Sequence, residues 1–464
     1  MPGEELFELS LEDPSVPHNP RSSIGTVDSY DRSGAVVRLN ESIAIGTEMF
    51  LDDRLPARIT ELRVTGEREL LAQCLFDRQI IGDLRTKIVT SEFEPASVDL
   101  GPGLLGTIVD PFGDPISDSP LEKFFITSAR STGSNRSWDL TILKDLSLGT
   151  KIRPNEIYGQ VIEQGLPHRL LYHSHFRGEN LTRIVSSGRY TIDEPLFRTA
   201  EAQEVRLFHR SPIEPQDPRF RGTDDRTFQI DDQLFARSPP IRFGSHLILD
   251  EQSNTQRTIE ALLLSPCFDL VITVLLDDQD QKLTELIPIL LLKRSDGYRC
   301  CDRMIIVQHR SEHTAAAADR TLAAGLTYAQ YYGAQGHRVL LFIDSFDEWI
   351  QTCAQTFTNV RKTMTEQMFA RIVLERYQTH LARSGLQRIK EHTDEPDVGS
   401  ITIVSYLRLI ETNSVLTGSI LDQVFQMGIR LGSVPHPSTE RSRKETAHPD
   451  QDSVGPLRRI DPDA

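Results

Sequence analysis

Asp344 is the residue whose position in the chain most clearly suggests chemistry. It follows the apolar run Val339–Ile343, which is short and bounded by polar residues and therefore predicts a strand buried on both faces. A carboxylate at the carboxyl end of a parallel strand lies where open α/β sheets bind ligands and metal ions. Aspartates at such positions also commonly start a loop or cap a helix, so Asp344 alone does not establish a site.

A phosphate-binding loop is the second feature that this chemistry needs. In its usual form, GxxxxGK[ST], the glycines let backbone N–H groups surround the phosphates, the lysine neutralises charge and the hydroxyl binds magnesium. The chain contains no such motif. The best candidate by position is Glu251–Thr258 (EQSNTQRT), where Glu251 and Gln256 replace glycines, Arg257 replaces the lysine and only Thr258 matches. Because a glutamate repels phosphate, a polar loop that opens a helix is the favoured interpretation.

Three histidines, His168, His173 and His175, suggest a metal site at first sight. His173 and His175 would share one face of a strand. No cysteine or carboxylate lies at ligand spacing in the sequence, and exposed histidines on strands are common. We therefore expect surface histidines here and no metal.

The stretch Arg303–Trp349 predicts the elements that would position Asp344. Met304–Val307 and Val339–Ile343 predict strands, and the Ala- and Leu-rich segment Ala315–Tyr332 predicts a crossover helix between them. Further strands are predicted at Leu247–Leu249, Leu270–Leu276 and Ser400–Val404. These elements together predict an α/β domain with a mostly parallel sheet.

Two β-rich regions precede this domain. Short alternating stretches separated by turn residues predict a β-barrel first and a small sandwich later, with a glycine- and proline-rich passage between them. We expect a flexible leader at 1–22, the barrel at 23–97, the passage at 98–137, the second β-rich domain at 138–200, a connector at 201–243, the α/β domain at 244–432 and a disordered tail at 433–464.

The composition excludes several classes of protein. A net charge of −16 over 464 residues argues against a nucleic-acid-binding or anionic-membrane-binding surface. The five cysteines are scattered without a CxxC pair, which fits a reducing compartment. The acidic start of the chain does not resemble a signal peptide, and no stretch reaches the roughly 20 apolar residues of a membrane span. We expect a cytoplasmic protein that contacts a membrane only through partner subunits.

Four blocks of the sequence resemble one family. They are SVDLGPGLLGTIVD (Ser97–Asp110), Gly149–Pro195 with SGRYTIDEP at its end, PPIRFGSHLILD (Pro239–Asp250) and the stretch Arg303–Trp349. In this order they are similar to the catalytic A subunit of the vacuolar and archaeal rotary ATPases. The resemblance implies a RecA-like α/β domain, an N-terminal barrel and, at 138–200, the inserted bulge domain of A subunits. It also implies B-type partner subunits in a hexameric head and the hydrolysis of Mg–ATP.

The residues that active members of this family use are mostly altered. The phosphate loop is replaced by Glu251–Thr258 or deleted with its strand, and the GER motif falls on 277–279, which leaves Asp278 as a remnant candidate for the base. The arginine of the NTSNMPVAAREA motif becomes Ala318, and that of DSTSRW becomes Glu348. The resemblance leaves a remnant nucleotide site of Arg257, Thr258, Asp344, Ser345 and Trp349, with Thr258 and Asp344 as the magnesium ligands.

Three functional hypotheses follow. The first is a pseudo-ATPase, a structural or regulatory subunit that keeps the architecture without hydrolysis and needs no cofactor. The second is a residually active subunit of a proton- or sodium-translocating ATPase, which would use Mg–ATP, Asp344 on the magnesium ion and Asp278 as base. The third is a free-standing protein-binding scaffold. All three imply protein partners, no nucleic acid and no direct membrane insertion.

Overall fold

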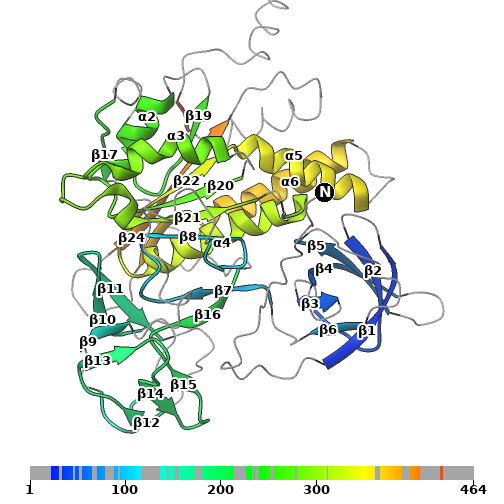
Figure 1. Ribbon diagram of the computed structural model, residues 1–464, viewed down its shortest axis with the longest axis horizontal. Helices are drawn as coiled ribbons and strands as arrows, with labels where there is room; N and C mark the ends of the chain where they lie inside the picture. The colour runs from blue at the N-terminus through cyan, green and yellow to red at the C-terminus, as the bar shows by residue number, and fades with distance from the viewer. Residues whose placement is uncertain are drawn as a thin grey trace, which may run out of the picture.

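The computed structural model places a barrel, a β-rich bulge and an α/β domain around one long helix (Figure 1). It describes residues 22–30, 34–44, 47–51, 55–64, 70–78, 88–91, 95–116, 136–143, 146–151, 156–172, 180–213, 226–232, 235, 240–250, 255–276, 280–310, 312–360, 366–388, 398–407 and 429–431. Residues 1–21 of the predicted leader and the whole predicted tail lie outside these residues, as do Glu251, Asp278, His173 and His175, whereas Ser22 already belongs to the first strand.

Six strands form the N-terminal barrel, closed in the order β1-β2-β5-β4-β3-β6. Side chains alternate between buried and more exposed along β2, as expected when one face of a strand lines a core. The interior is filled by apolar side chains such as Val37, Met49 and Phe76. The strands are β1 (Ser22–Tyr30), β2 (Gly34–Leu39), β3 (Glu48–Leu51), β4 (Leu55–Val64), β5 (Leu70–Phe76) and β6 (Ile88–Ser91).

A short passage leads from the barrel into the large sheet. β7 (Ser97–Leu100) pairs with β16 (His209–Pro212), and β8 (Thr107–Val109) joins the edge of the sheet beside β21 (Met304–Gln308). Gly101 lies between them, where a Cβ would come within 2.8 Å of Phe208 Cβ, so the glycine permits the close approach. The described part of the predicted connector 201–243 contains β16, and Ile213 just after it is buried.

The bulge consists of a four-stranded and a three-stranded antiparallel sheet that share one core. Trp138, Tyr158, Tyr172 and Phe197 are the large buried side chains of that core. The strand orders are β11-β10-β9-β13 and β12-β14-β15. Their bounds are β9 (Ser137–Ile142), β10 (Ile157–Glu163), β11 (Leu166–Leu171), β12 (Leu181–Ile184), β13 (Gly188–Thr191), β14 (Phe197–Thr199) and β15 (Glu204–Val205).

The α/β domain is built on one sheet of order β25-β19-β24-β22-β20-β21-β8, in which all of these neighbours are parallel. β23 (Gly385–Arg388) pairs antiparallel with β24. The five predicted strands are confirmed, because they fall within or overlap β19 (His246–Asp250), β20 (Leu270–Leu275), β21 (Met304–Gln308), β22 (Arg338–Asp344) and β24 (Val398–Leu407). The short strands β17 (Thr227–Phe228) and β18 (Ile241–Arg242) pair separately, and β25 covers Ile429–Leu431.

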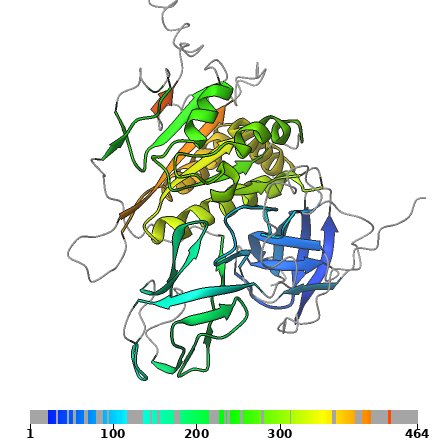
Figure 2. The same ribbon diagram turned by 60° about the vertical axis from the view of Figure 1, so that its left-hand side comes forward.

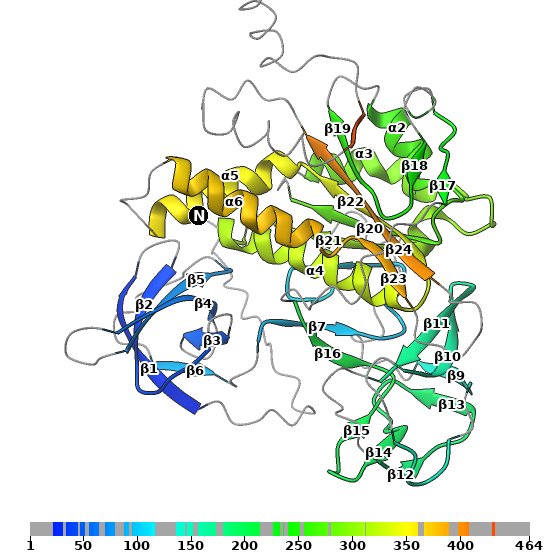
Figure 3. The ribbon, with the colours of Figure 1, turned by 180° about the vertical axis from the view of Figure 1, so that it is seen from behind.

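Helices cover both faces of this sheet. Along β20, Ile272 and Val274 face the core that contains α4 (Ala315–Ala334), α5 (Phe346–Val360) and α6 (Glu366–Leu381), whereas Val271 and Leu275 face α2 (Thr255–Leu263) and α3 (Asp280–Leu291). The predicted crossover helix is therefore α4, although β20 lies between the two strands that it connects. Figure 3 shows α4, α5 and α6 together on the face nearer the barrel.

The barrel and the bulge lie on the same side of the α/β domain (Figure 2). α4 touches both, because its N-terminal half reaches Glu48 and Asp77 of the barrel region and its C-terminal half reaches His168 of the bulge. None of the helices in the described ranges is long and apolar enough to cross a membrane. The α/β fold with an N-terminal barrel, predicted from the sequence, is confirmed.

Candidate functional site

The carboxyl edge of the parallel sheet is where the sequence placed a nucleotide. β19 ends at Asp250 and β22 ends at Asp344, and β24 pairs with both of them in parallel. The first turn of α2 and Asp344 therefore lie on the same edge of the sheet, one strand apart. This is the crevice in which open α/β sheets bind ligands.

Asp344 and Ser345 occupy the end of β22 in a constrained conformation. Asp344 is buried, and Ser345 is fully buried with a φ of +56°, in the left-handed region that non-glycine residues rarely adopt. Such strain costs on the order of 1–3 kcal/mol and collects at functional sites. The sequence contained no signal for this conformation, because serine has no preference for it.

Glu348 stands where the family motif has an arginine, and the structure gives it a local role. Asp347 and Glu348 are in the first turn of α5, and the Glu348 backbone N–H donates to the carbonyl of Ser345 at 2.9 Å. Acidic side chains at this place stabilise a helix, because its N-terminus carries partial positive charge. The glutamate therefore suits the start of the helix.

Arg257 and Thr258 lie in the first turns of α2 but face different surroundings. Arg257 is exposed, whereas Thr258 is buried and its hydroxyl lies 3.5 Å from Asp232 Oδ1. Thr258 and Asp344 are oxygen donors suited to magnesium. The Arg257 guanidinium is a cation that can pair with phosphate, and residues 251–254, which precede α2, lie outside the described part of the chain.

Trp349 was predicted at the remnant nucleotide site, but it packs inside the helical layer. It is fully buried, its ring stacks on Phe346 with centroids 5.2 Å apart, and its Nε1 donates to Asp319 Oδ1 at 3.4 Å. The structure thus brings Asp344 and Ser345 together at the sheet edge and places Trp349 one turn further along α5, in the core.

His168 corrects the expectation of a surface histidine. It is buried, its Nδ1 lies 2.6 Å from Glu163 Oε2, and its Nε2 lies 2.7 Å from the Tyr331 hydroxyl. The expectation failed because β10 and β11 form a hairpin that packs on α4, so Glu163 comes beside His168 across the turn. In the described part of the chain no three His, Cys, Asp or Glu side chains gather as a metal site.

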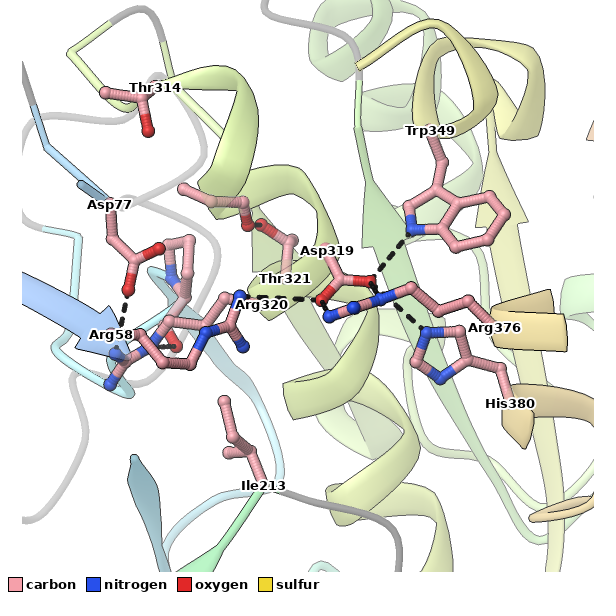
Figure 4. A network of polar contacts seen from close by, with 12 residues as sticks. Arg58, Asp77, Ile213, Thr314, Asp319, Arg320, Thr321, Trp349, Arg376 and His380 are labelled. Atoms are coloured by element: carbon pink, nitrogen blue, oxygen red, sulfur yellow. Dashed lines mark hydrogen bonds and ion pairs between the residues drawn. The ribbon is translucent and has the colours of Figure 1, made fainter. Parts of the chain in front are cut away.

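A buried polar cluster on α4 was not identified from the sequence. Arg320 contacts Glu48 and Asp77, and its neighbour Asp319 contacts side chains of β4, α5 and α6 (Figure 4). The signal that could have revealed it is an adjacent acid–base pair within an otherwise small and apolar helix. Ala318, at the position of the family motif's arginine, is buried in the core between the sheet and the helices.

Comparisons with known proteins agree with this architecture. Residues 250–426 match the nucleotide-binding domain of the ATP synthase alpha/beta family, and residues 129–214 match the ATP synthase alpha/beta subunit barrel-sandwich domain. The chain is 25% identical over 404 residues to the A subunit of the A-type ATP synthase of Saccharolobus islandicus (strain Y.G.57.14 / Yellowstone #1), covering 80% of this chain and 65% of that protein. It is 21% identical over 402 residues to the V-type ATP synthase alpha chain of Halothermothrix orenii, covering 81% of this chain and 66% of that protein.

A solved structure with a similar fold is the assembled ATPase EscN in complex with its central stalk EscO, from the type III secretion system of enteropathogenic E. coli. The TM-score is 0.54 at 14% sequence identity, over 87% of this chain and 73% of that chain. This likeness shows the fold alone. The chain spans about 65% of the length of the Saccharolobus islandicus protein.

Proposed function

We propose a function from the premise that this chain is a divergent homologue of the A subunits of A-type and V-type ATP synthases, with domains of the ATP synthase alpha/beta family. Within the rotary ATPases, we infer that it is a pseudo-ATPase that acts as a structural or regulatory subunit. The observation that carries this proposal is that the residues required for packing the α/β domain are kept, whereas the residues required for phosphoryl transfer are changed.

The retained features are those that packing requires. The parallel sheet, the Ala-rich helix α4 and Gly325, whose missing side chain lets α4 approach Val274, are all present. The altered features are those that only phosphoryl transfer requires. Arg257 is exposed in place of the loop lysine, and Glu348 adds negative charge at the start of α5. The sequence has neither the lysine nor the glycines of the phosphate motif, which are the residue types that stabilise a transferring phosphoryl group electrostatically.

Equilibrium binding of Mg–ATP to the full chain, followed by a hydrolysis assay, tests the proposal. We expect no saturable binding below about 1 mM, because the remaining oxygen donors do not compensate the phosphate charge. Micromolar binding that is lost in Asp344→Asn and in Thr258→Val, with turnover lost in Asp278→Asn, would overturn it. Arg338→Gln, which breaks the surface pair with Asp269, is the control that leaves the sheet edge unchanged.

One observation favours the second hypothesis, residual activity with Mg–ATP. Ser345 keeps a strained φ of +56° beside Asp344, and such strain is seldom retained without a functional reason. If magnesium binds here, Asp344 and Thr258 would hold it and the ion would supply charge neutralisation for a phosphate. Binding of Mg–ATP with normal affinity but no turnover would favour a nucleotide-sensing subunit over a hydrolase.

Partners are also part of the proposal. A B-type subunit in a hexameric head is the expected partner of a rotary subunit, whereas a free-standing scaffold would form no such ring. We propose a cytoplasmic protein that reaches a membrane only through partner subunits. The mass of the complex in solution, with and without a B-type subunit, distinguishes the two arrangements, because formation of a hexamer supports the rotary subunit and its absence supports the scaffold.

A further inference from the structure

Arg320 joins α4 to the barrel and to the passage that follows it. The side chain is buried, and its Nη1 donates to Glu48 Oε1 at 2.6 Å and to Asp77 Oδ2 at 3.1 Å. Its Nε donates to the carbonyl of Pro111 at 3.2 Å, and the guanidinium carbon lies 4.2 Å from the centre of the Phe112 ring. One side chain thus contacts a strand, a loop and the passage of the N-terminal region.

A second arginine also packs on the Phe112 ring. The guanidinium carbon of Arg78, which follows the barrel strand β5, lies 4.5 Å from the ring centre. Arg78 also pairs with Asp110 at 3.4 Å and with Asp114 at 3.8 Å, and both acids belong to the same passage loop as Phe112. The barrel is therefore joined to the passage loop by contacts of Arg78 and to α4 by contacts of Arg320, in addition to the peptide chain that runs from the barrel into the passage.

Asp319, the preceding residue, joins α4 to the two other helices on this face. Arg376 of α6 donates to it through Nε at 2.6 Å and through a second nitrogen, and His380 Nε2 lies 3.4 Å away. Trp349 of α5 donates at 3.4 Å, and Arg58 of the barrel strand β4 lies at 3.6 Å (Figure 4). One carboxylate therefore connects four elements.

The charged side chains of this cluster balance one another. Burial raises the pKa of Asp319 on its own, but Arg376 and His380 outweigh burial and hold the pKa well below its usual range. Burial lowers the pKa of His380, so its imidazole is neutral near pH 7 and the opposing charge comes from the arginines. Three arginines then face three carboxylates, namely Arg58, Arg320 and Arg376 against Glu48, Asp77 and Asp319.

The geometry of a helix explains why two adjacent residues serve different neighbours. Successive side chains on an α-helix are about 100° apart, so Asp319 and Arg320 diverge from one stretch of backbone. Arg320 reaches the barrel and the passage, and Asp319 reaches α5, α6 and Arg58 of the barrel strand β4. α5 begins just after Asp344 and Ser345, so the contact of Trp349 with Asp319 connects the junction to the sheet edge.

We propose that the Asp319–Arg320 junction couples the barrel to α5 and α6, holding all three in one orientation on the sheet. A barrel-side change at Glu48 is then transmitted to α5, and a change at Arg376 is transmitted to the barrel. The coupling is a property of the fold and does not require that nucleotide be bound. Buried charged networks are best known for specifying one arrangement rather than for adding stability.

Hydrogen exchange of the full chain, without nucleotide, tests this coupling. We expect Glu48→Gln to increase hydrogen exchange at least threefold in β3 and β4. Exchange in α5 should also increase, although the hydrogen bond that the substitution weakens is with Arg320 of α4 and not with α5. Arg376→Gln should increase exchange in α6 and, to a similar degree, in β3 and β4. Both substitutions introduce a neutral side chain that can still form hydrogen bonds, so they disturb folding less than Arg320→Met would.

Tyr331→Phe is the matched control, because Tyr331 lies on the same helix but contacts His168 of the bulge. It should increase exchange in β10 and β11 and leave the barrel strands unchanged. Increases confined to the element that carries each substitution would overturn the coupling, and so would an equal response of the barrel to Tyr331→Phe. Neither result depends on Mg–ATP, so failure here is separable from failure of the pseudo-ATPase proposal.

Discussion

At the scale of single residues, the buried acids behave in opposite ways according to their neighbours. Asp319 meets two arginines, and its pKa is held well below the usual range despite burial. For Asp110, burial and then the nearby Asp114 carboxylate raise the pKa to about 7, although Arg78 and two backbone N–H donors act in the other direction. Burial therefore determines the outcome only where compensating cations are few.

Asp110 leads to a prediction about pH. Its folded pKa lies above the ordinary value of about 3.9, so its contribution to stability is present at low pH and is lost as the pH rises towards 7. Asp110→Asn keeps an oxygen for the N–H groups of Phe112 and Asp114 but cannot ionise. We expect the variant to gain about 4 kcal/mol over the native chain between pH 4 and pH 8, because a difference of one between the folded and unfolded pKa corresponds to about 1.4 kcal/mol.

Thermal unfolding midpoints measured at several pH values from 4 to 8 check this. Asp114→Asn is the informative control, because Asp114 is largely exposed and its removal lowers the pKa of Asp110. The stability of the Asp114→Asn variant should therefore depend less on pH than that of the native chain, and its curve should lie closer to the curve of Asp110→Asn. Parallel curves for the native chain and Asp110→Asn would show that Asp110 does not titrate in this range.

At the scale of elements, α4 is the helix on which the domains assemble. Its Ala-rich sequence favours a helix, and its small side chains let the backbone approach the sheet closely. At Gly325 an added Cβ would lie 2.3 Å from Val274 Cγ2 of β20. Glycine disfavours the helix relative to alanine, but α4 and β20 lie too close together at this point to leave room for a side chain.

Gly325→Ala decides between these two effects. Helix propensity favours alanine by about 1 kcal/mol, whereas overpacking a core costs about 1–3 kcal/mol. We expect a net loss of about 1–2 kcal/mol in the native background, from urea unfolding curves. In a Val274→Ala background the clash is removed, so Gly325→Ala should stabilise the chain instead. A loss of the same size in both backgrounds would show that the contact with Val274 is not the cause.

At the scale of the whole molecule, the bulge is attached to the α/β domain by a few buried polar contacts. Glu163 Oε1 accepts the N–H groups of Gly103 and Leu105 at 2.8 and 2.9 Å, and Oε2 meets His168 at 2.6 Å. At the tip of the same hairpin, Arg303 donates to the carbonyl of Gln164 at 3.1 Å. The bulge is thus fixed to the passage and to the α/β domain along one hairpin.

Glu163→Ala should therefore loosen the bulge. It leaves two buried N–H groups and a buried imidazole without their acceptor, and we expect a loss of about 3 kcal/mol in unfolding free energy. Glu163→Gln retains an acceptor and should lose about 1 kcal/mol. Urea unfolding gives the free energies, and limited proteolysis should cut the bulge of the alanine variant first. Glu204→Ala, which breaks partly exposed pairs with Arg198 and Arg206, should cost under about 1 kcal/mol.

Local sequence patterns carried much of the α/β fold. Leu270–Leu276, Met304–Val307 and Val339–Ile343 are apolar on both faces, and such runs form strands only where a sheet is covered on both sides. The absence of a GxxxxGK[ST] motif was also readable, since that chemistry depends on residue types at fixed spacing, and the loss of hydrolysis inferred from it stays a prediction. The order of the strands in the sheet could not be predicted from the sequence, because β20 lies between the two strands of the β21–α4–β22 unit and β8 comes from far upstream in the chain.

The sequence by itself thus determined the fold class and the family resemblance, because periodicity and motifs are local properties of a chain. Only the tertiary structure decided what the polar residues do. Arg320 meets Glu48 and Asp77, and His168 meets Tyr331, over separations of 163 to 272 positions that no local pattern records. Trp349, part of a family motif, is a core residue here because Asp319 and Phe346 surround it.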